Sequence, residues 1–392
     1  MKIGSFSLIK ELNTSLILNT VREKKSISRA EIAKLTGLTA ATVTNITGKL
    51  IEYKLISETR FGKSNGGRKP IMLEFNGSGY HILGVVISRQ EITVSLTDLN
   101  SNPINIKRGA IEPPLTPDKV LGWIAKEGEA LIKESSKRVL GIGVSMEGLI
   151  DDKNGICVLS SGFGWKSVNI NDYLSKRLKL PVFVNNDVKA LAKGEELFGK
   201  GTKKDSFILL YISYGIGAAL VNNGKIYRGN SNYACEVGHI TLDINGPVCN
   251  CGNRGCFQAL ASGEALIEKI QSNHLDGLFE KKEITLSDIS KKIKEGDKII
   301  LELIEKQAVY IGTGIANIIN IFNPSEIIIN GYISNAPDYI RSAIMKEIDE
   351  KALPGVRENT NVIFSHMEDE GKYKGAAGLF ISRLFDNPEI YF

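Results

Sequence analysis

The first quarter of the chain shows apolar positions at helical spacing, interrupted by turn residues. Apolar side chains recur in this way over residues 8–24, and a second helix is predicted to begin after Ser28. Ser28 and Glu31 have the spacing of a capping box, which satisfies backbone amides at a helix start. Gly37 permits the left-handed residue of a sharp turn, and Thr39 is placed to cap a third helix. This order is typical of a helix-turn-helix, whose second helix enters the major groove of DNA.

The predicted third helix has an apolar face and a polar face. Val43, Ile46 and Leu50 are spaced at i, i+3 and i+7, so they form the face expected to enter a core. A three-helix bundle with a solvated polar face would show the same pattern, so the residues that follow must decide between the two. If this segment binds DNA, the side chains expected to contact DNA from its helices are Arg29, Thr39, Ala41, Thr42, Asn45 and Lys49.

The next residues predict a β-hairpin with a basic loop. Residues 55–59 and 71–75 alternate like two strands, and the glycine-rich segment between them contains Arg68 and Lys69. Such a hairpin is a wing, which places basic side chains against DNA phosphates or in a narrow minor groove. We therefore predict a winged helix-turn-helix DNA-binding domain over residues 1–75.

The distribution of charge agrees with this prediction. Residues 1–75 contain 13 Lys and Arg against 6 Asp and Glu, a balance of +7, whereas the remainder of the chain carries −2. Basic charge gathered at one end indicates an anionic partner, most simply double-stranded DNA.

Length and hydropathy indicate a soluble protein of two or three domains. A chain of 392 residues is too long for one core. It has no run of about 18 apolar residues that would span a bilayer, and its N-terminus lacks the apolar core of a signal peptide. We therefore expect a cytoplasmic protein with no membrane contact.

From residue 80 onward the pattern changes to strands followed by helices. Residues 81–87 and 91–98 resemble a hairpin, and strand–helix units recur near both ends of the remainder. This order predicts two α/β lobes with a cleft between them. The other elements expected are a helix near 117–137, strands at 139–146 and 182–185, a helix at 187–198, a strand at 207–212, a helix at 299–322 and a strand at 326–330.

Three of the five cysteines lie close together in the pattern His-x9-Cys-x-Cys-x4-Cys. One imidazole and three thiolates make the closed tetrahedral ligand set of a structural Zn²⁺ site, here His239, Cys249, Cys251 and Cys256. Disulfides are the alternative, but nothing in the chain indicates an oxidising compartment, and a Cys-x-Cys pair bridges poorly. Because four protein ligands leave no open position, we expect the Zn²⁺ to shape a loop and not to activate water.

Further motifs occur along the α/β remainder. They are Asn185-Asn186-Asp187, Ser213-Tyr214-Gly215-Ile216-Gly217, Glu236-Val237-Gly238-His239 and Cys-x-Cys-Gly-x-x-Gly-Cys. Together with the winged segment, they resemble the ROK family of bacterial sugar kinases and sugar-responsive repressors. The resemblance implies a two-lobed, actin-like fold of the sugar kinase, hexokinase and Hsp70 superfamily. We expect the first lobe at 76–195, joined by a C-terminal helix at 375–392, and the second lobe with the zinc loop at 196–374.

The resemblance also implies which residues bind the sugar. Asp187 matches the general base of the related kinases, although taken alone it is equally explained as a helix cap. The full expected set is Gly148, Ser161, Asn186, Asp187, Glu236, His239 and Gln258. Gln258 stands where the family usually has glutamate, so a glucose-like preference is not assumed. We expect a small sugar effector, either a pentose such as xylose or a hexose.

Three positions depart from the family's kinases in the parts that handle ATP. Those kinases have Asp-x-Gly-Gly-Thr where this chain has Val86-Ile87-Ser88-Arg89-Gln90. Tyr214 replaces a threonine, and a Gly-Gly pair is reduced to Asn330-Gly331-Tyr332. Phosphoryl transfer depends on positioning and charge neutralisation, so we expect no catalytic residues and no kinase activity.

The sequence therefore predicts a transcriptional regulator, most simply a repressor similar to the xylose-type members of the family. It would bind operator DNA as a homo-oligomer, a dimer or tetramer, and a sugar in the kinase-like cleft would control it. An active ROK sugar kinase that carries a DNA-binding domain is the first alternative. A regulator controlled by a protein partner is the second.

Overall fold

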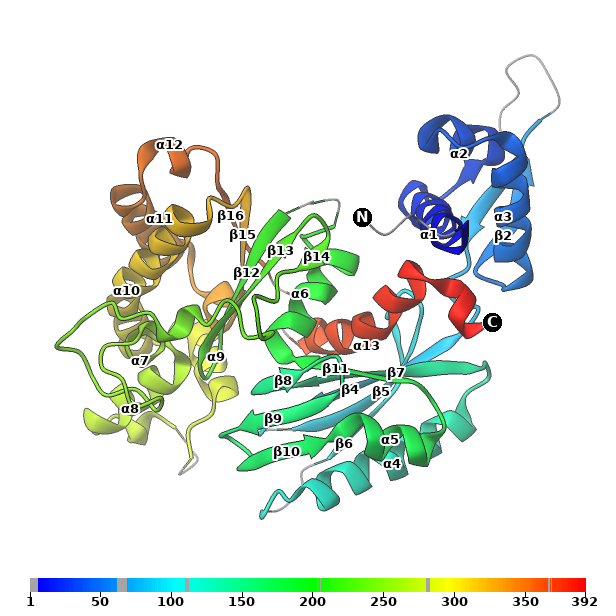
Figure 1. Cartoon of the computed structure of the whole chain (residues 1–392). Helices are drawn as coiled ribbons and strands as arrows, with labels where there is room; N and C mark the ends of the chain where they lie inside the picture. Colours follow the sequence, from blue (N-terminus) through cyan, green and yellow to red (C-terminus); the bar gives the residue numbers. More distant parts are fainter. Residues whose placement is uncertain are drawn as a thin grey trace. The chain divides into compact units, whose positions relative to one another are not determined.

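The computed structural model describes residues 6–61, 69–89, 91–109, 113–202, 204, 206–279, 283–365, 367 and 369–392 (Figure 1). The chain forms two compact units, one of Met1–Asn185 with Tyr373–Phe392 and the other of Asn186–Lys372. Each unit contains a five-stranded sheet. The C-terminal segment therefore returns to the unit that contains the N-terminus.

The N-terminal segment of the first unit is a winged helix-turn-helix, as predicted. Ser28 and Glu31 form the complete capping box, and Gly37 ends the second helix in the left-handed conformation with φ 70°. Thr39 caps the third helix by accepting the amide hydrogen of Thr42. The helices are α1 (Phe6–Lys24), α2 (Arg29–Thr36) and α3 (Ala40–Glu52), and the strands β1 (Ile27–Ser28), β2 (Ile56–Phe61) and β3 (Ile71–Phe75) pair in the order β1-β3-β2.

The lobe that follows has helices on both faces of its sheet. The sheet has the order β11-β7-β4-β5-β6, and a smaller sheet has the order β10-β9-β8. The elements are β4 (His81–Ile87), β5 (Ile92–Asp98), β6 (Pro103–Gly109), α4 (Pro117–Glu134), β7 (Val139–Met146), β8 (Leu149–Asp151), β9 (Ile156–Ser160), β10 (Trp165–Asn169), α5 (Ile170–Leu178) and β11 (Val182–Asn186).

Alternation along β4 explains the two covered faces. Leu83 and Val85 enter a core shared with α4 and α5, whereas Val86 packs on the C-terminal helix α13 (Asp369–Asp386). That helix lies directly against β7, because a Cβ atom at Gly143 would be 1.8 Å from the carbonyl oxygen of Ala376. Glycine at position 143 is therefore required by the close approach of two backbones.

The C-terminal segment also contacts the winged segment of the same unit. The ring of Phe392 stacks on Tyr53, with centroids 4.8 Å apart, and Phe385 meets Phe75 edge to face at 5.5 Å. Glu389, in the 3-10 turn η4 (Pro388–Tyr391), lies 2.9 Å from the ammonium group of Lys10. These contacts place the winged segment and the C-terminal residues in one packed unit.

The second unit has a mixed sheet with the order β14-β13-β12-β15-β16. Ile208, Leu210 and Ile212 of β12 enter a core with the long helix α10, and Phe207 and Leu209 pack on the opposite side with α6. The elements are α6 (Asp187–Phe198), β12 (Ser206–Ile212), β13 (Ile216–Asn222), β14 (Lys225–Ile226), η1 (Val237–His239), α7 (Phe257–Ala261), α8 (Gly263–Ser272), η2 (Asp276–Leu278), α9 (Leu286–Glu295), α10 (Lys298–Phe322), β15 (Glu326–Gly331), η3 (Tyr332–Asn335), α11 (Asp338–Lys351), α12 (Pro354–Arg357) and β16 (Asn361–Phe364).

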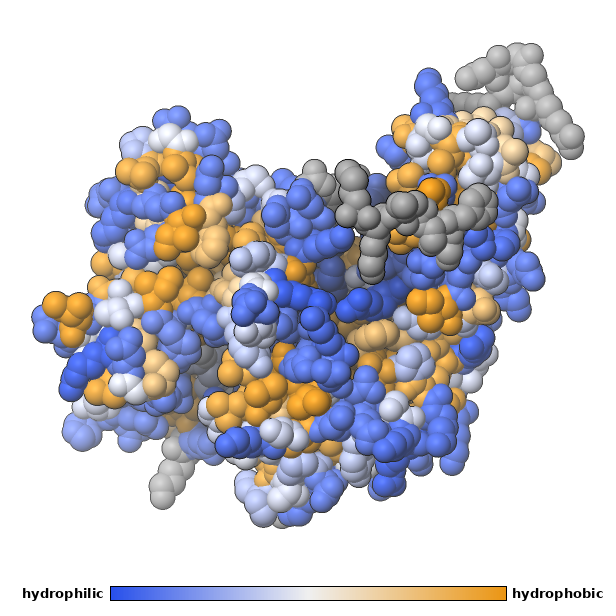
Figure 2. Space-filling view, in the orientation of Figure 1, coloured by the Kyte–Doolittle hydropathy of each residue, from blue (hydrophilic) through white to orange (hydrophobic). Residues whose placement is uncertain are grey.

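Most predicted elements are present close to their expected bounds, and the α/β class is confirmed. The expected helix at 375–392 is partly wrong, because α13 begins earlier and ends at Asp386, and η4 follows. On the face drawn in Figure 2, hydrophilic residues are interspersed with smaller apolar patches. Among the described residues, no helix is both long enough and apolar enough to cross a membrane.

Candidate functional site

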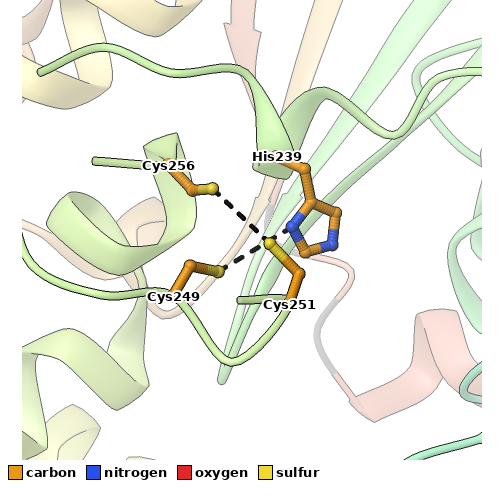
Figure 3. A group of neighbouring side chains, drawn as sticks. All are labelled: His239, Cys249, Cys251 and Cys256. Atoms are coloured by element: carbon orange, nitrogen blue, oxygen red, sulfur yellow. Dashed lines mark hydrogen bonds between the residues drawn. The ribbon is translucent and has the colours of Figure 1, made fainter. Parts of the chain in front are cut away.

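The four side chains of the predicted metal site meet in the second unit (Figure 3). His239 ends η1, Cys256 directly precedes α7, and Cys249 and Cys251 lie in the turn between these elements. The Sγ atoms of Cys251 and Cys256 are 3.8 Å apart, and Cys249 Sγ is 3.8 Å from His239 Nδ1. All four ligand atoms lie within 4.8 Å of one another.

Local backbone bonds hold this turn, and its geometry fits a tetrahedral cation. The amide of Cys249 donates to the carbonyl of Asn253 at 2.7 Å, and the amide of Gly252 donates to that of Cys249 at 2.8 Å. Two metal–sulfur bonds of about 2.3 Å at the tetrahedral angle place their sulfurs about 3.8 Å apart. A disulfide needs about 2.05 Å. All five cysteines are free thiols, so the disulfide alternative does not describe this cluster.

Asn186 and Asp187 stand where β11 ends and α6 begins, as predicted. Asn186 is the helix cap, since its Oδ1 accepts the amide hydrogens of Val188 at 3.0 Å and Lys189 at 3.3 Å. The interpretation of Asp187 as the cap is therefore wrong, and Asp187 is the first helical residue. Burial raises the pKa of Asp187, against the opposing effects of the Val188 amide and the charge of Lys372.

Glu236 lies near Asp187. Desolvation raises the pKa of Glu236, His239 and Lys189 lower it, and the charge of Asp187 raises it further. Glu236 nevertheless remains exposed, as a side chain that contacts a ligand must. Gln258 donates from Nε2 to Cys249 Sγ at 3.6 Å, which ties its amide to the cysteine cluster.

The other two expected sugar contacts belong to the first unit. Gly148 follows β7 with φ 116°, and a Cβ atom there would lie 2.5 Å from the carbonyl oxygen of Leu159. Ser161 comes directly after β9, which ends at Ser160. The first unit therefore brings Gly148 and Ser161 to the same end of the small sheet, and Asp187 and Glu236 are grouped in the second.

The residues at the three positions that were expected to depart from the kinases' phosphate-binding motifs bond to other protein groups. The Ser88 hydroxyl donates to the Glu91 carbonyl at 2.9 Å, and Arg89 Nε is 3.3 Å from a carboxylate oxygen of Glu147. The Tyr214 hydroxyl accepts the amide hydrogen of Leu286, the first residue of α9, at 3.2 Å.

The third of these positions is built into the core of the second unit. Asn330 is buried and donates to the Met367 carbonyl at 3.2 Å. Tyr332 is also buried, and its hydroxyl donates to Gln307 Oε1 at 2.9 Å. Burial raises the pKa of Tyr332 well above that of a solvated phenol.

The predicted DNA face of α3 is accessible at most of the expected positions. Ala41, Asn45 and Lys49 are exposed, and the hydroxyl groups of Thr39 and Thr42 lie 2.9 Å apart. The opposite face is buried, which confirms the two faces expected of this helix.

Two basic residues of the predicted DNA surface have partners within the winged segment or at the C-terminus. Arg29 donates from Nε to the Thr47 hydroxyl at 3.0 Å and from Nη2 to Glu58 at 2.7 Å. Lys49 Nζ is 3.9 Å from Glu389. In the wing, Lys69 is exposed, and Arg68 lies outside the described residues.

Sequence reasoning missed a buried lysine beside the predicted sugar residues. The side chain of Lys189, two positions after Asp187 on α6, is 6% exposed. Its ammonium group donates to the backbone oxygen of Asn232. Lysine in a helix is usually solvated, so the only sequence signal that could have drawn attention to Lys189 is its closeness to Asp187.

The chain matches the ROK family over residues 82–383. A xylose repressor from Caldicellulosiruptor bescii is 31% identical over 403 aligned positions, which cover 99% of this chain and 100% of that protein. The similarity to this repressor therefore includes the winged segment.

Solved structures of two kinds resemble the chain. A crystal structure described as a ROK family transcriptional regulator, homologous to the Escherichia coli Mlc protein, has a TM-score of 0.84 and 30% identity and covers 96% of this chain and 97% of its own. A ROK family glucokinase from Streptomyces griseus, in complex with glucose and AMPPNP, has a TM-score of 0.67 and 26% identity and covers 76% of this chain and 98% of its own. The chain belongs to the ROK family and has its actin-like fold, preceded by a winged helix-turn-helix.

Proposed function

We propose that the chain is a sugar-responsive transcriptional regulator, most simply a repressor, that binds operator DNA through α3 and the wing. The observation that carries this proposal is the extent of the similarity. The xylose repressor matches 99% of the chain, whereas the glucokinase leaves about a quarter of it unmatched. The alignment with the repressor includes the winged segment as well as the two lobes. A chain that resembles a repressor over both parts is best explained as a regulator itself.

The winged segment supports DNA binding through two kinds of contact. Asn45 and Thr42 on the polar face of α3 would reach base edges, since an amide side chain can bond adenine through both donor and acceptor. Lys69 and Arg68 in the wing would contact the phosphate backbone or the minor groove.

The second unit supports sugar binding without chemistry. Carboxylates accept hydrogen bonds from sugar hydroxyls, and Asp187 and Glu236 are near enough for their charges to interact. At the phosphate positions, Arg89 is paired with Glu147 and Tyr332 is buried in the core, which supports the absence of a nucleotide cradle. The chain would therefore bind a pentose such as xylose, or a hexose, and release it unchanged.

The cluster of His239, Cys249, Cys251 and Cys256 would hold one structural Zn²⁺. The distances between its ligand atoms fit that ion, and the metal would connect η1, which follows Glu236, to α7, which carries Gln258. Zn²⁺ bound in this way would cross-link a loop whose apolar side chains Ile244 and Val248 are exposed, at 79% and 60%.

Control of transcription requires that the sugar favour one of two arrangements of the protein. A ligand shifts such a balance only by its different affinity for the two forms. We propose that closure around the sugar changes the spacing of the winged segments in a homo-oligomer, a dimer or tetramer, bound to a two-fold symmetric operator. Such a protein acts in the cytoplasm, where the bacterial chromosome lies.

Selection of bound sequences from a random DNA pool tests the DNA-binding half of this proposal. The purified chain should enrich a two-fold symmetric site. Asn45→Ala should reduce discrimination between variants of that site, whereas Lys69→Ala should weaken binding evenly and lower its salt dependence. No enriched sequence, together with formation of sugar phosphate from ATP, would instead support the kinase alternative.

A further inference from the structure

The loop that carries Glu236 includes a cysteine whose backbone is in a conformation that cysteine rarely adopts. This Glu236 loop, residues 227–236, joins β14 to η1. Asn232 and Cys235 have positive φ angles of 65° and 72°. Asparagine tolerates this conformation better than most residues, but cysteine rarely adopts it, so contacts with the surrounding structure must hold the end of the loop in place.

Lys189 supplies such a contact. Its Nζ donates to the backbone oxygen of Asn232 and lies 3.4 Å from the side-chain oxygen of the same residue. A buried ammonium group needs partners of this kind, because an unpaired charge is strongly disfavoured away from water. Burial raises the pKa values of Cys235 and Glu236, and the charge of Lys189 opposes this rise in both groups, so Lys189 lies beside the end of the loop.

The position of Lys189 joins the two carboxylates that the proposed function assigns to sugar binding. Asp187 and Lys189 lie in the first turn of α6, and Asn232 lies four residues before Glu236. The Lys189–Asn232 bond therefore fixes the loop that carries one carboxylate to the helix that carries the other.

We propose that Lys189 is a positioning residue that sets the separation of Asp187 and Glu236 and thereby determines sugar affinity. The proposal rests on the proposed sugar site. It assigns Lys189 no contact with the sugar, so its effect must act through Glu236. Lys193 is a matched control, because it lies one turn further along α6, is 8% exposed, and pairs with Glu196 instead of the loop.

The test measures sugar binding by calorimetry in Lys189→Met and Lys193→Met, with the metal-loaded, full-length chain. The probe is whichever of D-xylose, D-glucose and N-acetyl-D-glucosamine binds the unmutated protein most tightly. Lys189→Met should weaken binding by about ten- to a hundredfold, comparable to loss of one buried hydrogen-bonding partner. Lys193→Met should stay within about threefold, and both variants should keep their metal content and their operator affinity without sugar.

A double-mutant cycle separates positioning from a general structural role. In a Glu236→Ala background, Lys189→Met should weaken binding by less than about threefold, because the carboxylate it positions is gone. An equal loss in both backgrounds, or unchanged affinity in Lys189→Met alone, would overturn the proposal. If Lys189→Met does not fold, Lys189→Gln takes its place, since glutamine keeps a donor but is shorter and uncharged; normal affinity there would equally overturn it.

The experiment distinguishes failure of the proposed sugar site from failure of the positioning role of Lys189. If the unmutated chain binds none of the three sugars, the proposed sugar site is wrong, and the role of Lys189 is overturned with it. If the unmutated chain binds a sugar and the cycle shows no coupling, the sugar site stands and only the role of Lys189 is wrong.

Discussion

Two sets of polar side chains differ in how the protein uses them. Asp187 and Glu236, at the proposed sugar site, interact with each other, and Glu236 remains exposed. At the positions that we assign to phosphate handling in the family's kinases, Arg89 is paired with Glu147 and Tyr332 bonds to Gln307 in the core. The side chains at the phosphate positions are therefore already bonded within the protein, whereas Glu236 at the proposed sugar site remains accessible to a ligand. This contrast is what a protein that binds a sugar without phosphorylating it should show.

Transfer of phosphate by the chain would contradict the contrast between the sugar site and the phosphate positions most directly. We expect no sugar phosphate from ATP and Mg²⁺ with any of the three sugars, because at the positions that we assign to phosphate handling Arg89 is ion-paired and Tyr332 is buried. Kinases turn over at roughly 1–100 per second. Mass spectrometry of the products checks this, and formation at such a rate would show that the phosphate positions still function.

Removing a cysteine should have the next largest effect. Cys251→Ser is expected to abolish binding of one Zn²⁺ per chain and to release the segment from Glu236 to Gln258, so that sugar affinity falls more than about a hundredfold. Elemental analysis and calorimetry measure the two effects. A metal-free protein with normal sugar affinity would show that the cluster does not shape the sugar site.

Loss of one sugar-binding carboxylate should have a smaller effect. Asp187→Ala is expected to reduce sugar affinity by about ten- to a hundredfold, since a buried hydroxyl left unpaired is disfavoured by about 1–3 kcal/mol. Operator affinity without sugar should not change, because residue 187 is far along the chain from the winged segment. Normal sugar binding with lost DNA binding would mean that Asp187 is structural.

Acidification should weaken sugar binding over a pH range set by the raised pKa of Asp187. An ionised carboxylate accepts hydrogen bonds through both oxygens, and protonation removes part of this capacity. Because burial raises the pKa of Asp187, the loss of affinity should begin at a higher pH than it would for a solvated aspartate. Affinity that does not change down to the ordinary range of aspartate would exclude Asp187 from the contact.

The smallest effect is expected at a phosphate position. Tyr214→Phe removes the hydroxyl that accepts the Leu286 amide hydrogen but no proposed sugar contact. Sugar affinity should stay within about twofold, with a modest fall in thermal stability of about 1 kcal/mol for one lost hydrogen bond. A tenfold loss of sugar affinity would place Tyr214 in the sugar site and remove the distinction between the two sets.

The sequence was most informative where local signals decide the structure. The helix expected at about residues 187–198 is present with those bounds, and Asn186 caps its start while Gly199 follows its end. The spacing of His239, Cys249, Cys251 and Cys256 also predicted that these four side chains meet, and in the structure they do.

The sequence did not predict short strands or contacts between residues that are distant in the chain. The strands β8 to β10 are three to five residues long, so they carry too little alternation to stand out. The burial of Lys189 depends on a loop more than forty positions away. The contact of Phe392 with Tyr53 joins residues more than 300 positions apart, so no local sequence pattern predicts it.

The central claim is that a sugar held by Asp187 and Glu236 controls DNA binding. Fluorescence anisotropy with the selected operator, titrated with D-xylose, D-glucose and N-acetyl-D-glucosamine, measures this coupling directly. The account predicts that one sugar changes operator affinity by about tenfold or more in the unmutated protein, and that Asp187→Ala shifts this response to at least about tenfold higher sugar concentration. Operator affinity that no sugar changes, or a response that Asp187→Ala leaves intact, would contradict it.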